Sequence, residues 1–313
     1  MDEAKAVNWK LPRSGRAGFW CPFRENSKGS RTNFWGSCQR KGAVIVPVKV
    51  AIIGGTGLYE NPHLEKPEKV IVETRFGRAL LYRGRHREQE IYFLARHGAG
   101  HGLPPHLVNY RANIAALKIL GIDAVLATAA VGSLRQEMAP GDLVVIDQFI
   151  DFTRGRPSTF FEGGGAGVVH IDMTEPYCPA LRGALLRAGE TLGEDIVDGG
   201  CYVCTEGPRF ETPAEIAMFA RWGGDLVGMT NVPEVVLARE AGLCYATITL
   251  VSNYAAGISA APLSHQEVLD EMARRKGALD RLLLEAAGGI AAKRTCKCSP
   301  GALKLEDITD EKP

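Results

Sequence analysis

The sequence predicts an α/β fold in which buried strands alternate with helices within one domain. Three observations support this prediction. From residue 44 onward, short apolar runs such as residues 51–58 and 91–98 alternate with segments of helical periodicity. Glycine or polar residues follow these runs and mark the ends of strands. The 313 residues are enough to bury a sizeable core. We expect the domain to cover residues 43–292.

The overall composition is that of an ordinary globular protein. Hydrophobic residues make up 45% of the chain and charged residues 23%, and the net charge is +1. This balance gives no electrostatic basis for nucleic-acid binding. No apolar run reaches the roughly 18 residues that a membrane-spanning helix needs, and no secretory segment precedes the domain. We therefore expect a cytoplasmic protein without a membrane or nucleic-acid partner.

Residues 1–42 differ from the rest of the chain. They hold nine Lys or Arg against three Asp or Glu, and three of the four tryptophans, without helical or strand periodicity. The mixture of basic and aromatic residues would suit an arm that binds nucleic acid, but a solvated segment or an upstream extension of the reading frame accounts for it too. We interpret the segment as a basic, poorly ordered N-terminal extension.

The first two strands of the domain end in groups that can bind an anion. Residues 51–58 run into a glycine loop with Thr56, and such a loop brings backbone amides close to a phosphate. The loop is not a dinucleotide fingerprint, because the G-x-G-x-x-G spacing fails. Residues 91–98 end in Arg96 and His97, two donors suited to an oxyanion.

The middle of the domain continues the alternation. After a helix at residues 109–120, the strand at residues 124–133 ends in small residues that leave room for a ligand against the backbone of Ala129 and Ala130. A strand at residues 143–150, a loop at residues 153–174 that contains His170, a helix at residues 179–192 and a strand at residues 200–205 follow. A loop of that length is usually functional or part of an interface.

Residues 225–240 form the stretch on which the functional prediction depends. A short strand at residues 226–229 meets a helix that begins near Pro233, and proline fits the first turn of a helix. Thr230 stands just ahead with a hydroxyl and with backbone amides that we expect to be free. We predict an anion site here; the alternative is an ordinary strand-to-helix turn with a capping threonine.

Phe210 and Glu211 lie on a loop that enters a helix at Pro213. The aromatic side chain can cover a flat ring while the carboxylate accepts hydrogen bonds from the edge of that ring. The alternative is that Glu211 is an exposed carboxylate at a helix start, where the helix dipole favours it.

Asn253 follows the strand at residues 243–250 and carries both a donor and an acceptor, so it can read the edge of a heterocycle. The last helix opens with a capping box at Ser264 and runs to about Ala287. His265, at its first position, would point back toward the strand ends.

The eight cysteines occur at irregular positions and do not predict a disulfide framework. Cys201 and Cys204 have the spacing of a redox pair but lie in a β-type run, so we interpret them as structural. Cys296 and Cys298 lie in a polar C-terminal tail, residues 293–313. One Cys-x-Cys pair is half a metal site at most, or a close-range disulfide, and the sequence leaves that pairing open. Since His97 and His101 lack the glutamate of a zinc-protease motif, we predict no metal site.

Five of these motifs resemble, in kind and order, those of the trimeric purine nucleoside phosphorylase and methylthioadenosine phosphorylase family. They are GGTG at residues 54–57, RHG at 96–98, EGPRF at 206–210, GMT at 228–230 and VPEV at 232–235. The resemblance covers residues 49 to about 290, and the residues of the motifs are most similar to those of the methylthioadenosine branch. It implies a single α/β domain with a mixed, distorted central sheet flanked by helices, a homotrimer, and phosphorolysis of purine nucleosides.

The same resemblance implies a role for individual residues. Met229 would lie against the ribose and purine, with Phe210 on the base, and His170 matches the position that reaches into a neighbouring subunit's site. The phosphate would be bound by Thr56, Arg96, His97, the backbone near Ala129 and Ala130, and Thr230, and the base by Phe210, Glu211, Met229, Asn253, Tyr254 and Ala255.

Several positions depart from the methylthioadenosine phosphorylases. Those enzymes have a small residue in place of Glu211, aspartates in place of Asn253 and Ala255, and an apolar residue in place of His265. At Glu211, Asn253 and His265 the chain resembles instead the phosphorylases that cleave inosine and guanosine.

The chemistry of the bases agrees with that second resemblance. A 6-oxopurine carries a hydrogen on N1 that Glu211 can accept, whereas adenine presents a lone pair that a carboxylate repels. Asn253 can donate to O6 and to N7 as negative charge builds on the leaving base. Such paired contacts can reject the wrong base by several orders of magnitude. His265 offers a hydrogen bond to a 5′-hydroxyl, where a methylthio group would need an apolar wall.

These expectations combine into one hypothesis, the reversible phosphorolysis of inosine and guanosine to free base and ribose 1-phosphate. Phosphate is a co-substrate, and no metal or organic cofactor is expected. Two alternatives stay open. One is the same chemistry on S-methyl-5′-thioinosine or S-methyl-5′-thioadenosine. The other is a nucleoside-binding protein without turnover.

Overall fold

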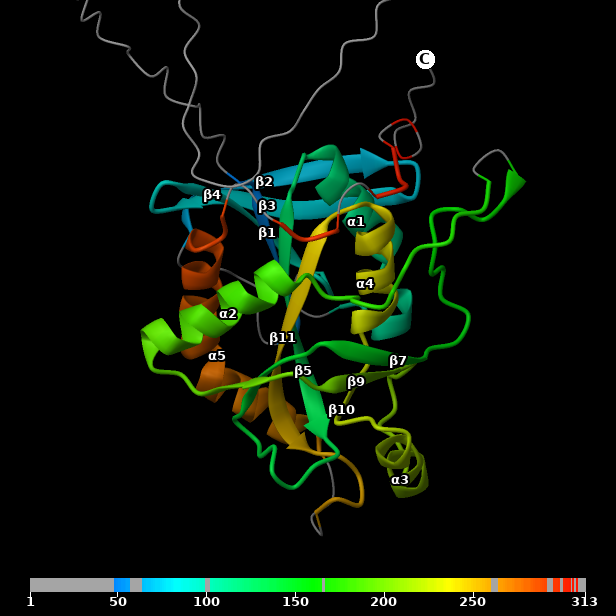
Figure 1. The fold of residues 1–313 in the computed structure, drawn as a ribbon, viewed down its shortest axis with the longest axis vertical. Coiled ribbons are helices and arrows are strands. Elements are labelled where there is room, and N and C mark those ends of the chain that lie inside the picture. The colour runs from blue at the N-terminus through cyan, green and yellow to red at the C-terminus, as the bar shows by residue number, and fades with distance from the viewer. Residues whose placement is uncertain are drawn as a thin grey trace, which may run out of the picture. The chain divides into compact units, whose positions relative to one another are not determined.

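A mixed β-sheet centred on strand β5 (Ala124–Ser133) organises the computed structural model of the domain (Figure 1). β5 runs parallel to β1 (Val50–Gly54) and to β11 (Cys244–Tyr254), and its last residues pair antiparallel with β10 (Leu226–Gly228). Nine of its ten residues are buried, as a strand with neighbours on all sides requires. Because β5 has three partners, the sheet branches around it, and the mixed α/β fold expected from the sequence is confirmed.

The structure describes residues 48–56, 64–98, 102–164, 167–259, 264–291, 295–298, 301–304, 306 and 308. The N-terminal extension predicted for residues 1–42 lies outside this part of the chain, as do Gly57 of the glycine loop and His101. Residues 45–313 group as one unit, which contains the sheet and its helices.

The remaining strands extend this sheet in both directions. Beside β1, β4 (Gln89–Ala95) is parallel to it, and the antiparallel strands β3 (Gly77–His86) and β2 (Glu65–Thr74) follow. Beside β10, β9 (Cys201–Thr205) is parallel to it, and β7 (Gln148–Phe152) is parallel to β9. β6 (Leu143–Val145) joins β11 to β8 (Ile196–Asp198).

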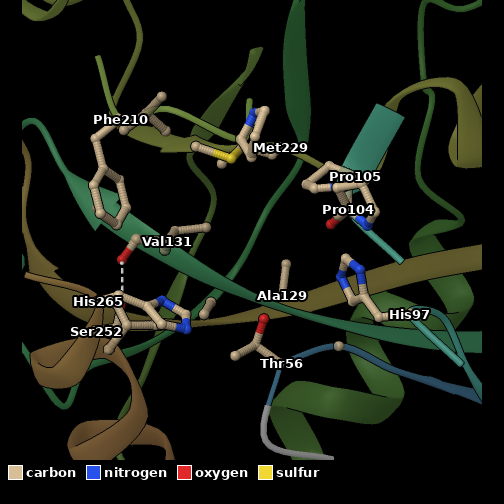
Figure 2. A pocket seen from close by; sticks show the side chains of 18 of the residues that line it. Thr56, His97, Pro104, Pro105, Ala129, Val131, Phe210, Met229, Ser252 and His265 are labelled. Carbon is tan, nitrogen blue, oxygen red and sulfur yellow. Dashed lines mark hydrogen bonds between the residues drawn. The ribbon is translucent and has the colours of Figure 1, made fainter. Parts of the chain in front are cut away.

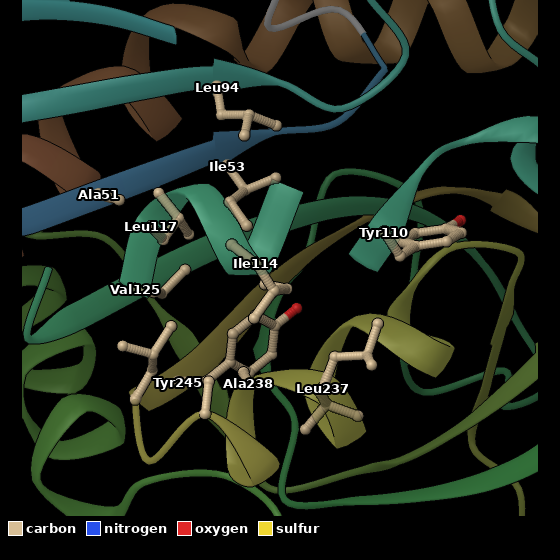
Figure 3. Packing of buried hydrophobic residues seen from close by; sticks show 14 of the residues in the cluster. Ala51, Ile53, Leu94, Tyr110, Ile114, Leu117, Val125, Leu237, Ala238 and Tyr245 are labelled. Atoms are coloured by element: carbon tan, nitrogen blue, oxygen red, sulfur yellow. The ribbon is translucent and has the colours of Figure 1, made fainter. Parts of the chain in front are cut away.

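Two pairs of helices cover the sheet on opposite sides of β5 and β11 (Figure 1). One pair is α1 (Tyr110–Ile119) with α4 (Asn231–Glu240), and the other is α2 (Pro179–Leu192) with α5 (His265–Gly288). Figure 3 shows how Ile114 and Leu117 of α1 pack toward Ile53 and Val125 of the sheet. Burying one such side chain contributes about 1.5–3 kcal/mol.

Local signals in the sequence explain where the helices begin. The side chain of Asn109 accepts a hydrogen bond from the amide of Ala112 and caps α1. Capping boxes start α3 (Pro213–Arg221) and α5, the latter at Ser264 as predicted. A cap of this kind contributes about 1 kcal/mol. None of the helices in the described ranges is long and apolar enough to cross a membrane.

The structure departs from the predicted elements in two places. The strand expected at residues 143–150 is two strands, β6 and β7, because Asp147 turns the chain between them and accepts a hydrogen bond from the amide of Gly200. Strands β2, β3 and β8 had not been predicted. Most side chains of β2 are exposed, so this strand lacks an apolar pattern.

Candidate active site

A cavity of about 390 Å³ lies where β1, β4, β5, β9, β10 and β11 end (Figure 2). This volume is typical of a site for a small organic molecule, and strand ends in α/β sheets commonly carry such sites. The structure brings together twelve of the residues predicted for the site: Thr56, Arg96, His97, Ala129, Ala130, Phe210, Glu211, Met229, Thr230, Asn253, Ala255 and His265.

Two predicted residues lie outside the cavity. Tyr254 does not line it, and its hydroxyl donates to the carbonyl of Gln136 at 3.1 Å. Successive residues of a strand point to opposite faces, so Tyr254 turns away where Asn253 turns in. We therefore correct its predicted role as a base-binding residue within this chain. His170 is exposed on the loop at residues 153–174, away from this chain's own cavity.

Arg96 is held rigidly at the phosphate end of the predicted site. Its side chain is 1% exposed and forms a two-pronged ion pair with Glu234, with both N–O distances 2.7 Å. One terminal nitrogen also donates to the carbonyl of Thr128 at 2.8 Å. Burial lowers the pKa of Arg96, but the charge and hydrogen bonds of Glu234 outweigh this effect and raise it. The second N–H of each terminal nitrogen is then available to an oxyanion.

His97 lines the cavity, and a contact of its Nδ1 fixes the orientation of the ring. Nδ1 lies 2.8 Å from the carbonyl oxygen of Leu103. A carbonyl only accepts, so Nδ1 carries the hydrogen. The histidine expected beside Arg96 therefore lines the cavity in a fixed orientation.

The backbone amides expected to bind an anion are largely used within the protein. The amide of Gly55 donates to the hydroxyl of Thr128 at 2.9 Å, and a Cβ at Gly55 would come within 2.8 Å of the Thr128 carbonyl. The amides of Thr230 and Val232 donate to the hydroxyl of Tyr202 and to the sulfur of Cys204, both at 3.3 Å. The prediction of free amides beside Thr230 was therefore wrong, because side chains of β9 occupy them.

The hydroxyl of Thr230 is oriented differently from that of a capping residue. Thr230 is buried, and its side chain makes no capping hydrogen bond to α4. Val232 has non-helical torsion angles, so the regular helix begins at Pro233, as predicted. The simple capping alternative for Thr230 is wrong.

Glu211 keeps one carboxylate oxygen for a ligand. Its Oε1 accepts a hydrogen bond from Thr205 at 2.6 Å, and the residue lines the cavity. Burial raises the pKa of Glu211, while the Thr205 hydrogen bond opposes that shift. The half-buried carboxylate therefore gains from a hydrogen-bond donor on a ligand.

A β-bulge explains why two consecutive residues of β11 face the cavity. Val251 pairs with Val131 and Asn253 with Gly132, so Ser252 is the extra residue, and both Ser252 and Asn253 line the cavity. Bulges commonly redirect side chains beside active sites. Nδ2 of Asn253 donates to the Tyr254 carbonyl at 2.9 Å, and Oδ1 accepts from Ser252 at 2.7 Å. These contacts fix which end of the amide is the donor.

His265 lines the cavity from the first turn of α5, with Phe210 and Met229 also on its wall (Figure 2). His265 therefore lies at the ends of the strands, where the sequence predicts it. Phe210 is 37% exposed, so one of its faces is open to a ligand.

Two residues that support the site were not assigned a role from the sequence. Glu234 lies within the VPEV motif at residues 232–235, and its burial beside Arg96 marks it as the partner of that arginine. Tyr245 donates to the same carboxylate at 2.8 Å. No signal in the sequence indicates this pairing, because Glu234 and Arg96 lie 138 positions apart.

Arg156 is the second missed residue. Its side chain is 2% exposed and pairs with Glu206. It donates to the carbonyls of Met229, Val232, Thr205 and Glu206 at 2.7–3.2 Å. It therefore connects the long loop to the ends of β9 and β10. No local pattern distinguishes this arginine from the exposed Arg154 two residues earlier.

Taken together, the cavity combines the guanidinium of Arg96, whose donors suit an oxyanion, with the carboxylate of Glu211 and the amide of Asn253, which suit the hydrogen-bonding edge of a heterocycle. Among the described residues that line the cavity, Glu211 is the one carboxylate.

Comparisons with known proteins agree with this geometry. The model of the Phosphorylase superfamily matches residues 49–287. A protein of Moorella thermoacetica named probable 6-oxopurine nucleoside phosphorylase is 54% identical over 83% of this chain and 100% of its own length. The 6-oxopurine nucleoside phosphorylase of Pyrococcus furiosus is 49% identical over 80% and 96%. Among solved structures, methylthioadenosine phosphorylase from Schistosoma mansoni in complex with adenine has a TM-score of 0.75 at 38% identity, over 79% of this chain and 93% of that one.

Proposed function

Because the chain belongs to the Phosphorylase superfamily, we propose that it is a purine nucleoside phosphorylase, a pentosyltransferase that cleaves 6-oxopurine nucleosides. Inosine and guanosine would react reversibly with phosphate to give hypoxanthine or guanine and ribose 1-phosphate, a reaction of purine salvage. The names of relatives at 49–54% identity support this substrate class.

The single observation that carries the base preference is that Glu211 and Asn253 both line the cavity. Oε1 of Glu211 accepts from Thr205. The other carboxylate oxygen would accept a hydrogen bond from N1–H of a 6-oxopurine. Asn253 has an N–H beyond the one given to Tyr254, and it would donate to O6 or N7. Adenine offers a lone pair at N1 and a donor at its 6-position, so the contacts at these two positions would be mismatched.

The proposed reaction begins with phosphate on Arg96, His97, Thr56 and Thr230, beneath C1′ of the ribose. The bond between C1′ and N9 breaks, and its electron pair moves to the purine, where Asn253 stabilises the growing charge as a donor while Glu211 holds the base through N1–H. A phosphate oxygen then forms the new bond to C1′ from the opposite face. Because Glu234 already balances the charge of Arg96, the phosphate keeps much of its negative charge, which stabilises the oxocarbenium-like sugar.

No metal or organic cofactor takes part in this scheme. Phosphate supplies the nucleophile, and the base leaves as an anion or takes a proton from water.

The test is phosphate-dependent base release from inosine, guanosine, adenosine, S-methyl-5′-thioinosine and S-methyl-5′-thioadenosine at equal concentration. We expect inosine and guanosine to react fastest, with kcat/KM at least about 100-fold above that of adenosine. Fast thioinosine with slow inosine would keep the roles of Glu211 and Asn253 but overturn that of His265. A preference for thioadenosine would overturn the proposal for the base, and nucleoside binding without product would overturn enzymatic function.

The second candidate is a methylthio-nucleoside substrate. The structural similarity to methylthioadenosine phosphorylase favours it, and the imidazole of His265 disfavours it. A His265→Leu variant separates the two. Under our proposal it loses activity on inosine and gains on thioinosine.

We further propose a cytoplasmic homotrimer in which His170 completes the site of a neighbouring subunit. The loop at residues 153–174 extends beyond the helices in Figure 1, and Val168 on it is 70% exposed. An exposed valine and histidine on a projecting segment suit an interface.

A further inference from the structure

Four cysteines that are distant in sequence come together outside the active-site cavity. Cys178 precedes α2, Cys244 begins β11, and Cys296 and Cys298 belong to the C-terminal tail. Their Sγ atoms all lie within 4.8 Å of one another, and those of Cys244 and Cys296 are 3.5 Å apart. The sequence had suggested half a metal site at most; the fold supplies the other half.

The arrangement of the sulfurs matches a tetrahedral metal site. Zn²⁺ binds thiolates at about 2.3 Å in a tetrahedron, which places the sulfurs about 3.8 Å apart. The separation of 3.5 Å is close to that value and far from the roughly 2.05 Å of a disulfide. Two disulfides would need only two pairs to meet, whereas here all four sulfurs converge.

The chemistry of the donors narrows the choice of cation. All four are sulfur, and a donor set of four thiolates in a tetrahedron is typical of Zn²⁺ or iron. Cys178, Cys244 and Cys298 are buried and Cys296 is half-buried. A closed site of this kind is structural, because it leaves no open position for a substrate.

We propose that Cys178, Cys244, Cys296 and Cys298 bind one Zn²⁺ that fastens the C-terminal tail to the domain. Each thiol releases its proton to the solvent as the metal binds. Beyond the cluster, Leu303 is buried and its amide donates to the Glu240 carbonyl at 2.9 Å. The carbonyl of Ile308 accepts from the amide of Arg75 at 3.1 Å. Two described residues of the tail thus contact the end of α4 and the turn after β2, and the metal holds the start of the tail.

The cluster is also one residue away from the network that supports Arg96. Tyr177 precedes Cys178, and its hydroxyl donates to the side chain of Asn231, next to Thr230. Tyr245 follows Cys244 and donates to Glu234. The amide of Cys178 donates to the carbonyl of Tyr245 at 2.8 Å, which joins the two segments. Loss of the metal should therefore raise KM for phosphate. This effect rests on the proposed function, whereas metal binding itself is independent of that function.

The test begins with the full chain purified under reducing conditions without chelator. Elemental analysis should find about one zinc per chain. Replacement by Co²⁺ should give the intense visible bands of a tetrahedral cobalt thiolate. Removal of the metal with a chelator should lower Tm by more than about 5 °C, and added Zn²⁺ should restore it.

Variants then locate the metal. Cys298→Ser should bind little zinc, while the matched control Cys201→Ser, a half-buried cysteine of β9 outside the cluster, should keep it. If Cys298→Ser does not fold, the cobalt spectrum of the unaltered chain still shows whether four thiolates bind a metal. Four reduced thiols without metal, disulfides among these four residues by mass spectrometry, or iron in place of zinc would each overturn the proposal. Zinc binding without phosphorolysis would leave it standing and reject the proposed function instead.

Discussion

At the scale of single residues, the charge of Glu211 should decide which purine reacts. Glu211→Gln replaces an acceptor by a group that can donate to N1 of adenine. We expect kcat/KM for inosine to fall about 100-fold, the effect of losing a charged hydrogen bond of 1.5–3 kcal/mol, and adenosine to improve. Steady-state kinetics on both substrates provides the measurement, with the exposed Glu73→Gln on β2 as control.

The raised pKa of Glu211 gives this variant a pH signature. The ionised form is the active one, so kcat/KM for inosine should fall as pH drops through a value above the ordinary glutamate pKa, and Glu211→Gln should lose that limb. A raised pKa also means that the folded state binds the proton more tightly than the unfolded state, so stability from this group falls as pH rises. Glu211→Gln should therefore have a Tm at pH 7 no lower than the unaltered protein. An inosine rate unchanged in the variant would contradict its role.

Glu234 should support phosphate binding through Arg96. Glu234→Gln leaves a buried guanidinium without its counter-charge, which costs about 3–5 kcal/mol of stability, and we expect KM for phosphate to rise at least about tenfold. The control is Glu68→Gln, which breaks the exposed pair with Arg83 and should cost less than about 1 kcal/mol. Thermal melting and phosphate titrations measure both effects; equal losses in the two variants would refute the assignment.

At the scale of elements, the long loop depends on Arg156. Four carbonyl oxygens around the ends of β9 and β10 accept from this one side chain. In Arg156→Lys a single ammonium cannot replace a planar fork of donors. We expect kcat/KM for the nucleoside to fall at least about tenfold with little change in KM for phosphate, because Met229 and the segment that carries Glu211 lose their fixed position.

Arg154→Lys is the matched control for Arg156, since Arg154 is exposed on the same loop. It should behave as the unaltered protein does. A larger loss in phosphate affinity than in nucleoside turnover would show that Arg156 acts elsewhere.

Most elements that build the site could be predicted from the sequence, because their signals are local. The buried run of β5 and the capping box of α5 show this directly. The exposed strand β2 could not be predicted. Most of its side chains are exposed, so its sequence shows no apolar pattern, and pairing with β3 is what makes it a strand.

The same limit applies to the site. Thr56 and Arg96 follow strands and Asn253 lies near the end of one, so their convergence follows from the order of the elements. The use of the Thr230 amide by Tyr202 and the ion pair of Arg96 with Glu234 join residues 28 and 138 positions apart. No pattern in the sequence shows such contacts. The cysteine cluster was predicted only in part for the same reason, because Cys178 and Cys244 are distant in sequence from Cys296 and Cys298.

At the scale of the whole molecule, the projecting loop predicts shared active sites. Light scattering should give the mass of a trimer, and His170→Ala should lower kcat/KM for inosine without changing that mass. Co-expression with the inactive variant Asn253→Ala should restore part of the activity, because a hybrid contains intact sites completed by His170 of the inactive subunit. Hybrids without recovery, or a monomeric mass, would reject the arrangement.

The two halves of the cavity differ in exposure, and this difference sets the order in which substrates should enter. Arg96, His97 and Thr230 are 2%, 3% and 7% exposed, whereas Phe210 is 37% exposed. A nucleoside seated on Phe210 would therefore lie between solvent and the phosphate position, and phosphate should bind first. The free base should then leave before ribose 1-phosphate, so the sugar phosphate should inhibit competitively against phosphate. The burial that holds Arg96 rigid would in this way also impose an ordered mechanism, in which phosphate binds first and ribose 1-phosphate leaves last.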